Sequence, residues 1–160
     1  NISPFLRGGG QERNMRPGTE NIYAIAGMCK ALELAYENLT RDTKYIKELK
    51  YHMINKLRSE IPGVNFYGNS ANIDNSLYTV LSVSFPEHSA SEMLLFNLDI
   101  LGISCSGGSA CASGSTKGSH VLSTLAPDSR RTGIRFSFSK YNTIDEIDFT
   151  INKIKEIFIS

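Results

Sequence analysis

The stretch GIRFSFS, residues 133–139, alternates between apolar and polar residues. A period of two predicts a β-strand with one face in the protein core and the other face turned away from it. The apolar face carries Ile134, Phe136 and Phe138. The polar face carries Arg135, which this alternation places outside the core.

Further strands are expected on both sides of this one. The run LYTVLSVSF, residues 77–85, is rich in β-branched residues and partly alternating, which predicts a second long strand. Short strands are expected at residues 64–66 and from Ile103. The sheet is therefore short, and its strands do not alternate with helices regularly enough for a repeated βαβ array.

Apolar residues recur at helical spacing in the segments around these strands. The expected helices cover residues 19–39, 41–61, 89–101, 119–125 and 143–158. We predict Thr19 as the N-cap of the first helix, and capping boxes at 89–92 and 143–146 for two others. Cys29 lies on the apolar face of the first helix, so we expect it in the core. Short strands packed against such helices give an α+β fold.

The composition excludes only a few classes of function. The chain has 160 residues and a net charge of +1, which gives no reason to expect nucleic-acid or membrane binding. No apolar run approaches the length that spans a bilayer. The first residue, Asn1, is not an initiator Met, and we expect a processed product or an excised fragment. Three cysteines without a CxxC spacing or a secretory signal indicate reduced thiols in a cytosol-like compartment.

The segment CSGGSACASGS, residues 105–115, places two cysteines among Gly, Ala and Ser. Such a composition predicts an exposed, mobile loop with an available thiol. Cys111 is central in the loop and is the better candidate, whereas Cys105 follows a strand end and is expected to be half buried. There are four alternatives: both cysteines are only small loop residues without a chemical role, they form a Cys105–Cys111 disulfide, they belong to a cysteine protease, or they bind a metal together with His120. No spacing in the sequence favours the last two.

Two other features point to anions. Gly8–Gly10 and Pro17-Gly18-Thr19 lead into a helix N-terminus, where backbone N–H groups favour an anion, although no Walker A or GxGxxG pattern accompanies them. Arg135 matches a carboxylate in shape and charge, but most arginines in such a position are ordinary surface charges, and the residues alone favour that interpretation.

Three blocks occur together in this chain: GGGQERNMRPGTENIYAIAGMCKALELA, GSACASGS and IRFSFSKYNTIDEID. Their order and intervals resemble the C-terminal part of cysteine desulfurases of the NifS/IscS type, which are class V aminotransferase-like enzymes of fold-type I. The resemblance implies pyridoxal 5'-phosphate as the cofactor, held mainly by a larger domain whose lysine-bearing His-Lys motif does not occur here. It also implies an arm at residues 1–18, a small C-terminal domain at 19–160, and a catalytic-cysteine loop at about 104–118.

The resemblance carries roles to three residues. Cys111 aligns with the catalytic cysteine, which takes the sulfur of L-cysteine as a persulfide and leaves L-alanine. Arg135 aligns with the arginine that holds the substrate carboxylate. Thr19 aligns with the threonine that reaches the cofactor phosphate of a neighbouring subunit, which implies a homodimer. Nothing points to a metal ligand.

The expected function is therefore sulfur supply for iron–sulfur clusters, thio-cofactors or thiolated tRNA, with a sulfur acceptor or scaffold protein as partner. A cytoplasmic location is expected, and an organellar matrix is equally consistent. We expect the 160 residues alone to be inactive, because the cofactor lysine is missing. The rival functions are a selenocysteine lyase, another class V aminotransferase-like enzyme, and a non-catalytic scaffold-docking domain.

Overall fold

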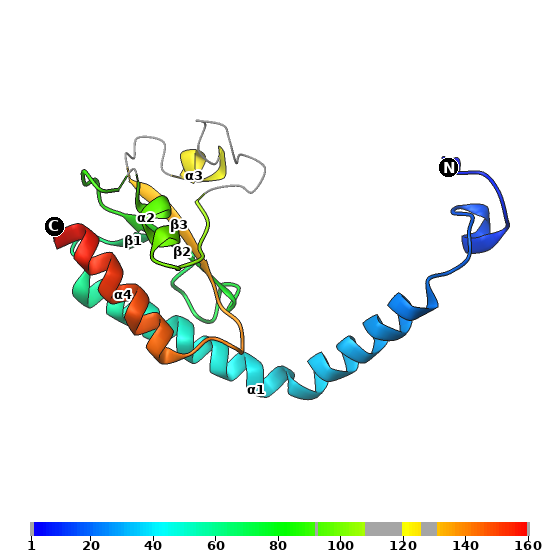
Figure 1. Cartoon of the computed structure of the whole chain (residues 1–160), viewed down its shortest axis with the longest axis horizontal. Helices are drawn as coiled ribbons and strands as arrows, with labels where there is room; N and C mark the ends of the chain where they lie inside the picture. Colours follow the sequence, from blue (N-terminus) through cyan, green and yellow to red (C-terminus); the bar gives the residue numbers. More distant parts are fainter. Residues whose placement is uncertain (1, 92, 108–119, 126–130, 160) are drawn as a thin grey trace. The chain divides into compact units, whose positions relative to one another are not determined.

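The chain forms two compact units, residues 1–40 and 41–160. The structure is a computed structural model, and it describes residues 2–91, 93–107, 120–125 and 131–159. The boundary between the units falls inside the long helix α1, Ile22–Glu60 (Figure 1). The domain boundary expected after residue 18 stays a prediction, and the two units are described separately below.

The first unit begins with a turn rather than a fully extended arm. The short element η1, Gln11–Asn14, has positive φ angles at Glu12, Arg13 and Asn14. Residues other than glycine rarely adopt this left-handed conformation, because it costs roughly 1 kcal/mol per residue. The Gln11 side chain braces the turn, because its Oε1 accepts a hydrogen bond of 3.3 Å from the Gly18 backbone N–H.

The N-cap of α1 is Asn21, so the prediction of Thr19 as the cap is wrong. The Asn21 Oδ1 accepts a hydrogen bond of 3.1 Å from the Ala24 N–H. An amide oxygen at this position satisfies one of the N–H groups that the first turn leaves unpaired. Thr19 lies before the helix and is exposed, which leaves its hydroxyl available for other contacts.

The apolar stripe on the first half of α1 is exposed. Within the first unit none of the described residues is buried, and Met28 and Leu32 are 66% and 57% exposed. Cys29 lies on the same stripe and is exposed too, so the prediction that it is in the core is wrong. The spacing identified the apolar face correctly, but no described part of this unit covers it.

A single helix replaces the two that were expected over residues 19–61. The residues at the expected break, around Thr40, include neither Gly nor Pro, so nothing there interrupts the backbone hydrogen bonds. Asn38 instead donates from Nδ2 to the Leu34 carbonyl at 2.8 Å, which is compatible with a continuing helix. The predicted stop at Pro62-Gly63 is confirmed, because α1 ends at Glu60 and Gly63 has a φ of +76°.

The second unit contains an antiparallel sheet in the order β1-β2-β3. Strand β1 is Asn65–Phe66, β2 is Val80–Phe85 and β3 is Thr132–Ser137. The register of β2 and β3 pairs Val83 with Ile134 and Ser82 with Arg135. The expected strand from Ile103 is not formed in the described residues, where that segment meets β3 through one isolated bridge at Ser106.

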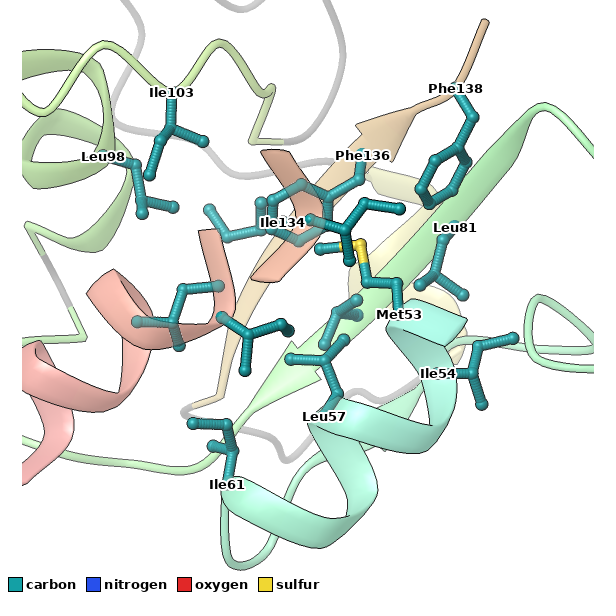
Figure 2. Packing of buried hydrophobic residues seen from close by; sticks show 14 of the residues in the cluster. Met53, Ile54, Leu57, Ile61, Leu81, Leu98, Ile103, Ile134, Phe136 and Phe138 are labelled. Carbon is teal, nitrogen blue, oxygen red and sulfur yellow. The ribbon is translucent and has the colours of Figure 1, made fainter. Parts of the chain in front are cut away.

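The core lies between one face of this sheet and the helices (Figure 2). From α1 the buried stripe includes Leu49, Met53 and Leu57, as its spacing predicts. The apolar face of β3 is buried as well, with Ile134 and Phe136 at 2% and 5% exposure. The α+β class is therefore confirmed, and Arg135 is fixed on the far side of the sheet from the core.

Three shorter helices complete this unit. They are α2, Leu94–Ile100, α3, His120–Leu125, and α4, Ile144–Ile159. The capping box expected at residues 89–92 does not open α2, because this helix begins at Leu94 with Met93 as its N-cap and no side-chain cap hydrogen bond. Ion pairs from α1 to α4, such as Glu60 to Lys155 at 3.4 Å, join these two helices side by side.

The predicted capping box at the start of α4 is confirmed. The Glu146 N–H donates to Thr143 Oγ1 at 3.2 Å, and the Thr143 N–H donates to Glu146 Oε2 at 3.0 Å. Because the second bond favours the carboxylate, it lowers the pKa of Glu146.

Thr143→Ala removes the hydroxyl that caps α4, and we expect it to lower the free energy of unfolding by about 1 kcal/mol. Thr143→Ser keeps the hydroxyl and serves as the control, with stability close to that of the parent chain. Urea denaturation of both variants checks this expectation. Equal stabilities of the Ala and Ser variants would contradict it.

Lys50 is a buried lysine whose ammonium ties α1 to the segment before β2. Its side chain has 0% exposure, and Nζ donates to Ser76 Oγ at 2.8 Å and to the Leu77 carbonyl at 2.9 Å. Neither partner carries a charge, so burial lowers the pKa of Lys50 from its usual value of 10.5.

This burial makes stability depend on alkaline pH. Between the lowered pKa of Lys50 and 10.5 the unfolded chain holds more protons, so the free energy of unfolding rises with pH in that window. We expect the stability of the parent chain relative to Lys50→Met to increase across this window, as measured by urea denaturation at several pH values. The exposed Lys44→Met control should show no such trend. A flat difference for both variants would exclude the effect.

Candidate functional site

The loop that carries Cys111 cannot be described directly, but both of its flanks can. Cys111 belongs to residues 108–119, which lie outside the described residues. The incoming flank ends at Gly107, and the outgoing flank begins with α3. The site is therefore built from what these two flanks contact.

Arg135 lies in the middle of β3 and is exposed. Its neighbours Ile134 and Phe136 point into the core, so the pleat of the strand directs Arg135 to the opposite face. The prediction from alternation is confirmed in this respect. The guanidinium thus lies on the face where a ligand can reach it.

The incoming flank is bound to β3 at Arg135 itself. The Ser106 N–H donates to the Arg135 carbonyl at 3.1 Å, and the Arg135 N–H donates to the Ser106 carbonyl at 2.7 Å. The Arg135 Nε also donates to Ser106 Oγ at 3.1 Å. Three hydrogen bonds therefore place the start of the cysteine loop beside the candidate carboxylate-binding residue.

Sequence reasoning missed Ser106. Serines are frequent throughout this loop, and nothing in the sequence gives the register between the loop and β3.

Cys105 is half buried, as predicted, and packs against the core. Burial, and after it the nearby Asp99 carboxylate, raises the pKa of the Cys105 thiol to about 11. With this pKa, about one thiol in a thousand is ionised at pH 8. Cys105 is therefore unsuited to act as a nucleophile near neutral pH.

The outgoing flank also reaches β3. A Cβ added at Gly133 would lie 2.7 Å from Leu122 Cδ1 of α3 and 3.2 Å from Tyr67 Cε2. A side chain at position 133 would therefore push the Leu122 side chain aside. Both ends of the cysteine loop are thus placed on β3, at neighbouring outward positions.

A second arginine lies close by in the sequence but has a different role. Arg131 donates from Nε to Ser84 Oγ at 2.7 Å and from Nη2 to the Gly63 and Ser84 carbonyls. These bonds fasten β3 to β2 and to the turn after α1. Arg131 therefore holds the sheet together, which leaves Arg135 as the better candidate for binding a substrate.

Thr19 belongs to the first unit. It is exposed and lies next to Gly18, which has a φ of +108°. Arg16 braces this turn, because Nη1 donates to the Gly18 carbonyl at 3.0 Å and the same guanidinium forms an ion pair with Glu20. An exposed hydroxyl on a braced turn before a helix suits contact with a phosphate.

The described part of the chain contains neither a metal-binding cluster nor a membrane-spanning helix. In that part of the chain no group of three or more His, Cys, Asp or Glu side chains is placed to hold a metal ion. Nor does any helix described there combine the length and hydropathy needed to cross a bilayer.

Comparison with known proteins identifies the family. Residues 6–149 match the aminotransferase class-V family. The chain is 35% identical over 158 residues to cysteine desulfurase IscS of Dictyoglomus turgidum, covering 98% of this chain and 39% of that protein. It is also 35% identical over 156 residues to cysteine desulfurase NifS of Azotobacter vinelandii, covering 96% of this chain and 38% of that protein.

Solved structures agree with the sequence matches. The X-ray structure of a NifS-like protein from Rickettsia africae covers 100% of this chain and 41% of its own, with a TM-score of 0.74 and 31% identity. The chain thus spans about two fifths of the length of the curated relatives that it matches. By the extent of the family match and its agreement with the fold, this chain belongs to the class-V aminotransferase family, among relatives named as cysteine desulfurases.

Proposed function

We propose that this chain is the part of a pyridoxal-phosphate-dependent cysteine desulfurase that holds the substrate carboxylate and carries the sulfur-accepting thiol. The observation that supports this most directly is the Ser106–Arg135 contact, which places the root of the Cys111 loop beside an exposed arginine. The names of the relatives supply the substrate, L-cysteine, and the reaction.

Arg135 binds the α-carboxylate of L-cysteine in this proposal, since a guanidinium donates two parallel hydrogen bonds to a carboxylate. Cys111 then attacks the substrate sulfur as a thiolate. The new S–S bond forms as the substrate C–S bond breaks, and the released electron pair stays on the substrate carbon. Protonation of that carbon gives L-alanine, and Cys111 keeps the sulfur as a persulfide. Pyridoxal phosphate, when bound, supplies the electron sink that makes cleavage of the C–S bond possible.

The residues of this chain suit one contact with that cofactor. The Thr19 hydroxyl is exposed and suits a phosphate oxygen. Lys50, the one buried lysine in the described part, has its amine occupied by Ser76 and the Leu77 carbonyl, so it is not available to bind the cofactor covalently. We infer that the cofactor lysine belongs to further polypeptide and that these 160 residues alone do not turn over cysteine.

The wider roles follow from the same proposal. Thr19 reaches the cofactor phosphate of a second subunit, so the active enzyme is a homodimer. The persulfide passes to an acceptor or scaffold protein, supplying iron–sulfur clusters, thio-cofactors or tRNA in the cytoplasm. A selenocysteine lyase or an aminotransferase is less well supported, because the relatives reported above are named as cysteine desulfurases.

The two loop cysteines separate this proposal from a passive docking domain. In the full-length protein loaded with pyridoxal phosphate, Cys111→Ala should abolish alanine formation from L-cysteine. Cys105→Ala should retain activity within about twofold, because the raised pKa of Cys105, about 11, keeps it protonated. Alanine is measured directly, and loss of activity in Cys105→Ala alone would overturn the assignment. Full activity of Cys111→Ala would contradict the proposed function.

Arg135→Lys tests the carboxylate contact. Lysine keeps the charge but loses the two-pronged geometry, so we expect KM for L-cysteine to rise about tenfold with a smaller change in kcat. Arg41→Lys, at an exposed arginine of α1, is the matched control and should leave KM unchanged. Steady-state kinetics of the full-length protein give both values, and an unchanged KM in Arg135→Lys would remove Arg135 from the site.

A further inference from the structure

We propose that Ser106 is the positioning residue for Arg135: its hydroxyl orients the guanidinium for the substrate carboxylate, and its backbone fixes where the cysteine loop leaves the sheet. This inference rests on the proposed function, because it assigns the partner that holds Arg135 in place. It adds a specific residue and a specific geometry for the carboxylate.

The contact joins two segments that are far apart in sequence. The backbone N–H and C=O groups of residues 132, 134 and 136 point toward β2. This follows from the register, because the Phe138 N–H, two residues further along, donates to the Thr79 carbonyl at 2.8 Å. Arg135 therefore turns its backbone to the outer edge of the sheet, where Ser106 receives it. Among the described residues this is the sole bridge outside the named strands.

The side-chain bond decides which edge of the guanidinium is available. Nε donates to Ser106 Oγ at 3.1 Å, and a guanidinium has five N–H donors in one plane. With Nε occupied, the four N–H groups on Nη1 and Nη2 remain. The carboxylate is then held end-on by the two Nη atoms, in a direction that the Ser106 hydroxyl sets.

The backbone bonds of Ser106 hold the incoming flank itself at the outer edge of β3. The next residue, Gly107, lies close to α2, because a Cβ there would be 3.2 Å from Leu95 Cδ2.

The hydroxyl and the backbone of Ser106 are separable by mutation. Any residue except proline keeps the two backbone bonds, whereas only a hydroxyl keeps the bond from Nε. In the described residues Arg135 is the one hydrogen-bond partner of Ser106 Oγ. Thr and Val have nearly the same shape and differ in the hydroxyl, so they form a matched pair at this position.

The experiment compares Ser106→Val with Ser106→Thr in the full-length protein loaded with pyridoxal phosphate. We expect Ser106→Val to raise KM for L-cysteine five- to tenfold, with kcat within about twofold, and Ser106→Thr to stay within twofold of the parent in both. Ser104→Ala, at an exposed serine two residues earlier, is the control and should change neither. Melting temperatures should be equal in all variants, and Ser106→Ala replaces Ser106→Val if the latter does not fold.

Equal KM values for the Val and Thr variants would overturn the role of the hydroxyl. A fall in kcat with unchanged KM would overturn it too, because misplacement of Arg135 acts on substrate binding. These failures are distinct from failure of the proposed function. If Arg135→Lys raises KM while Ser106→Val does not, only this inference is lost, whereas an unchanged KM in Arg135→Lys removes the carboxylate contact itself.

Discussion

The register of β2 against β3 is the constraint on which the rest of this structure depends. Pairing Val83 with Ile134 places the apolar residues of both strands on one face. A slip of one residue would turn every side chain of β3 over. Arg135 would then enter a core made of Leu, Ile and Phe, where an unpaired guanidinium costs several kcal/mol. Core packing and the outward direction of Arg135 are thus two results of one register.

Arg131 and Lys50 hold this register from two sides. Arg131 binds Ser84 on β2 and the turn at Gly63, which fastens the start of β3. Lys50 fastens the segment that precedes β2 to α1. The bonds that these two cations donate to oxygen atoms of Ser84, Gly63, Ser76 and Leu77 hold the neighbouring segments in place.

The sequence predicts those features that depend on local periodicity. The alternation of residues 133–139, the buried stripe of α1 after Thr40 and the Thr143–Glu146 capping box are all confirmed. The features that failed depend on neighbours that a period does not reveal. Cys29 lies on an apolar face, but burial needs a covering element. The N-cap of α1 is Asn21 and not Thr19, because sequence alone does not set the first helical turn.

The site was predictable only in part for the same reason. The outward direction of Arg135 follows from the pleat of a strand. Cys105 is half buried as expected, although the strand expected before it is not formed in the described residues. The contact of Ser106 with Arg135 spans 29 positions of sequence, and no local pattern specifies such a pairing. The roles of Cys111 and Thr19 stay predictions.

The anchoring of both loop flanks on β3 has an evolutionary consequence. Ser106 and Leu122 each contact the strand. A change of length between two such anchors costs little, because each doubling of loop length adds only about 0.6 kcal/mol of closure entropy. Lineages can therefore vary the length of this segment while both flanks keep their contacts with β3.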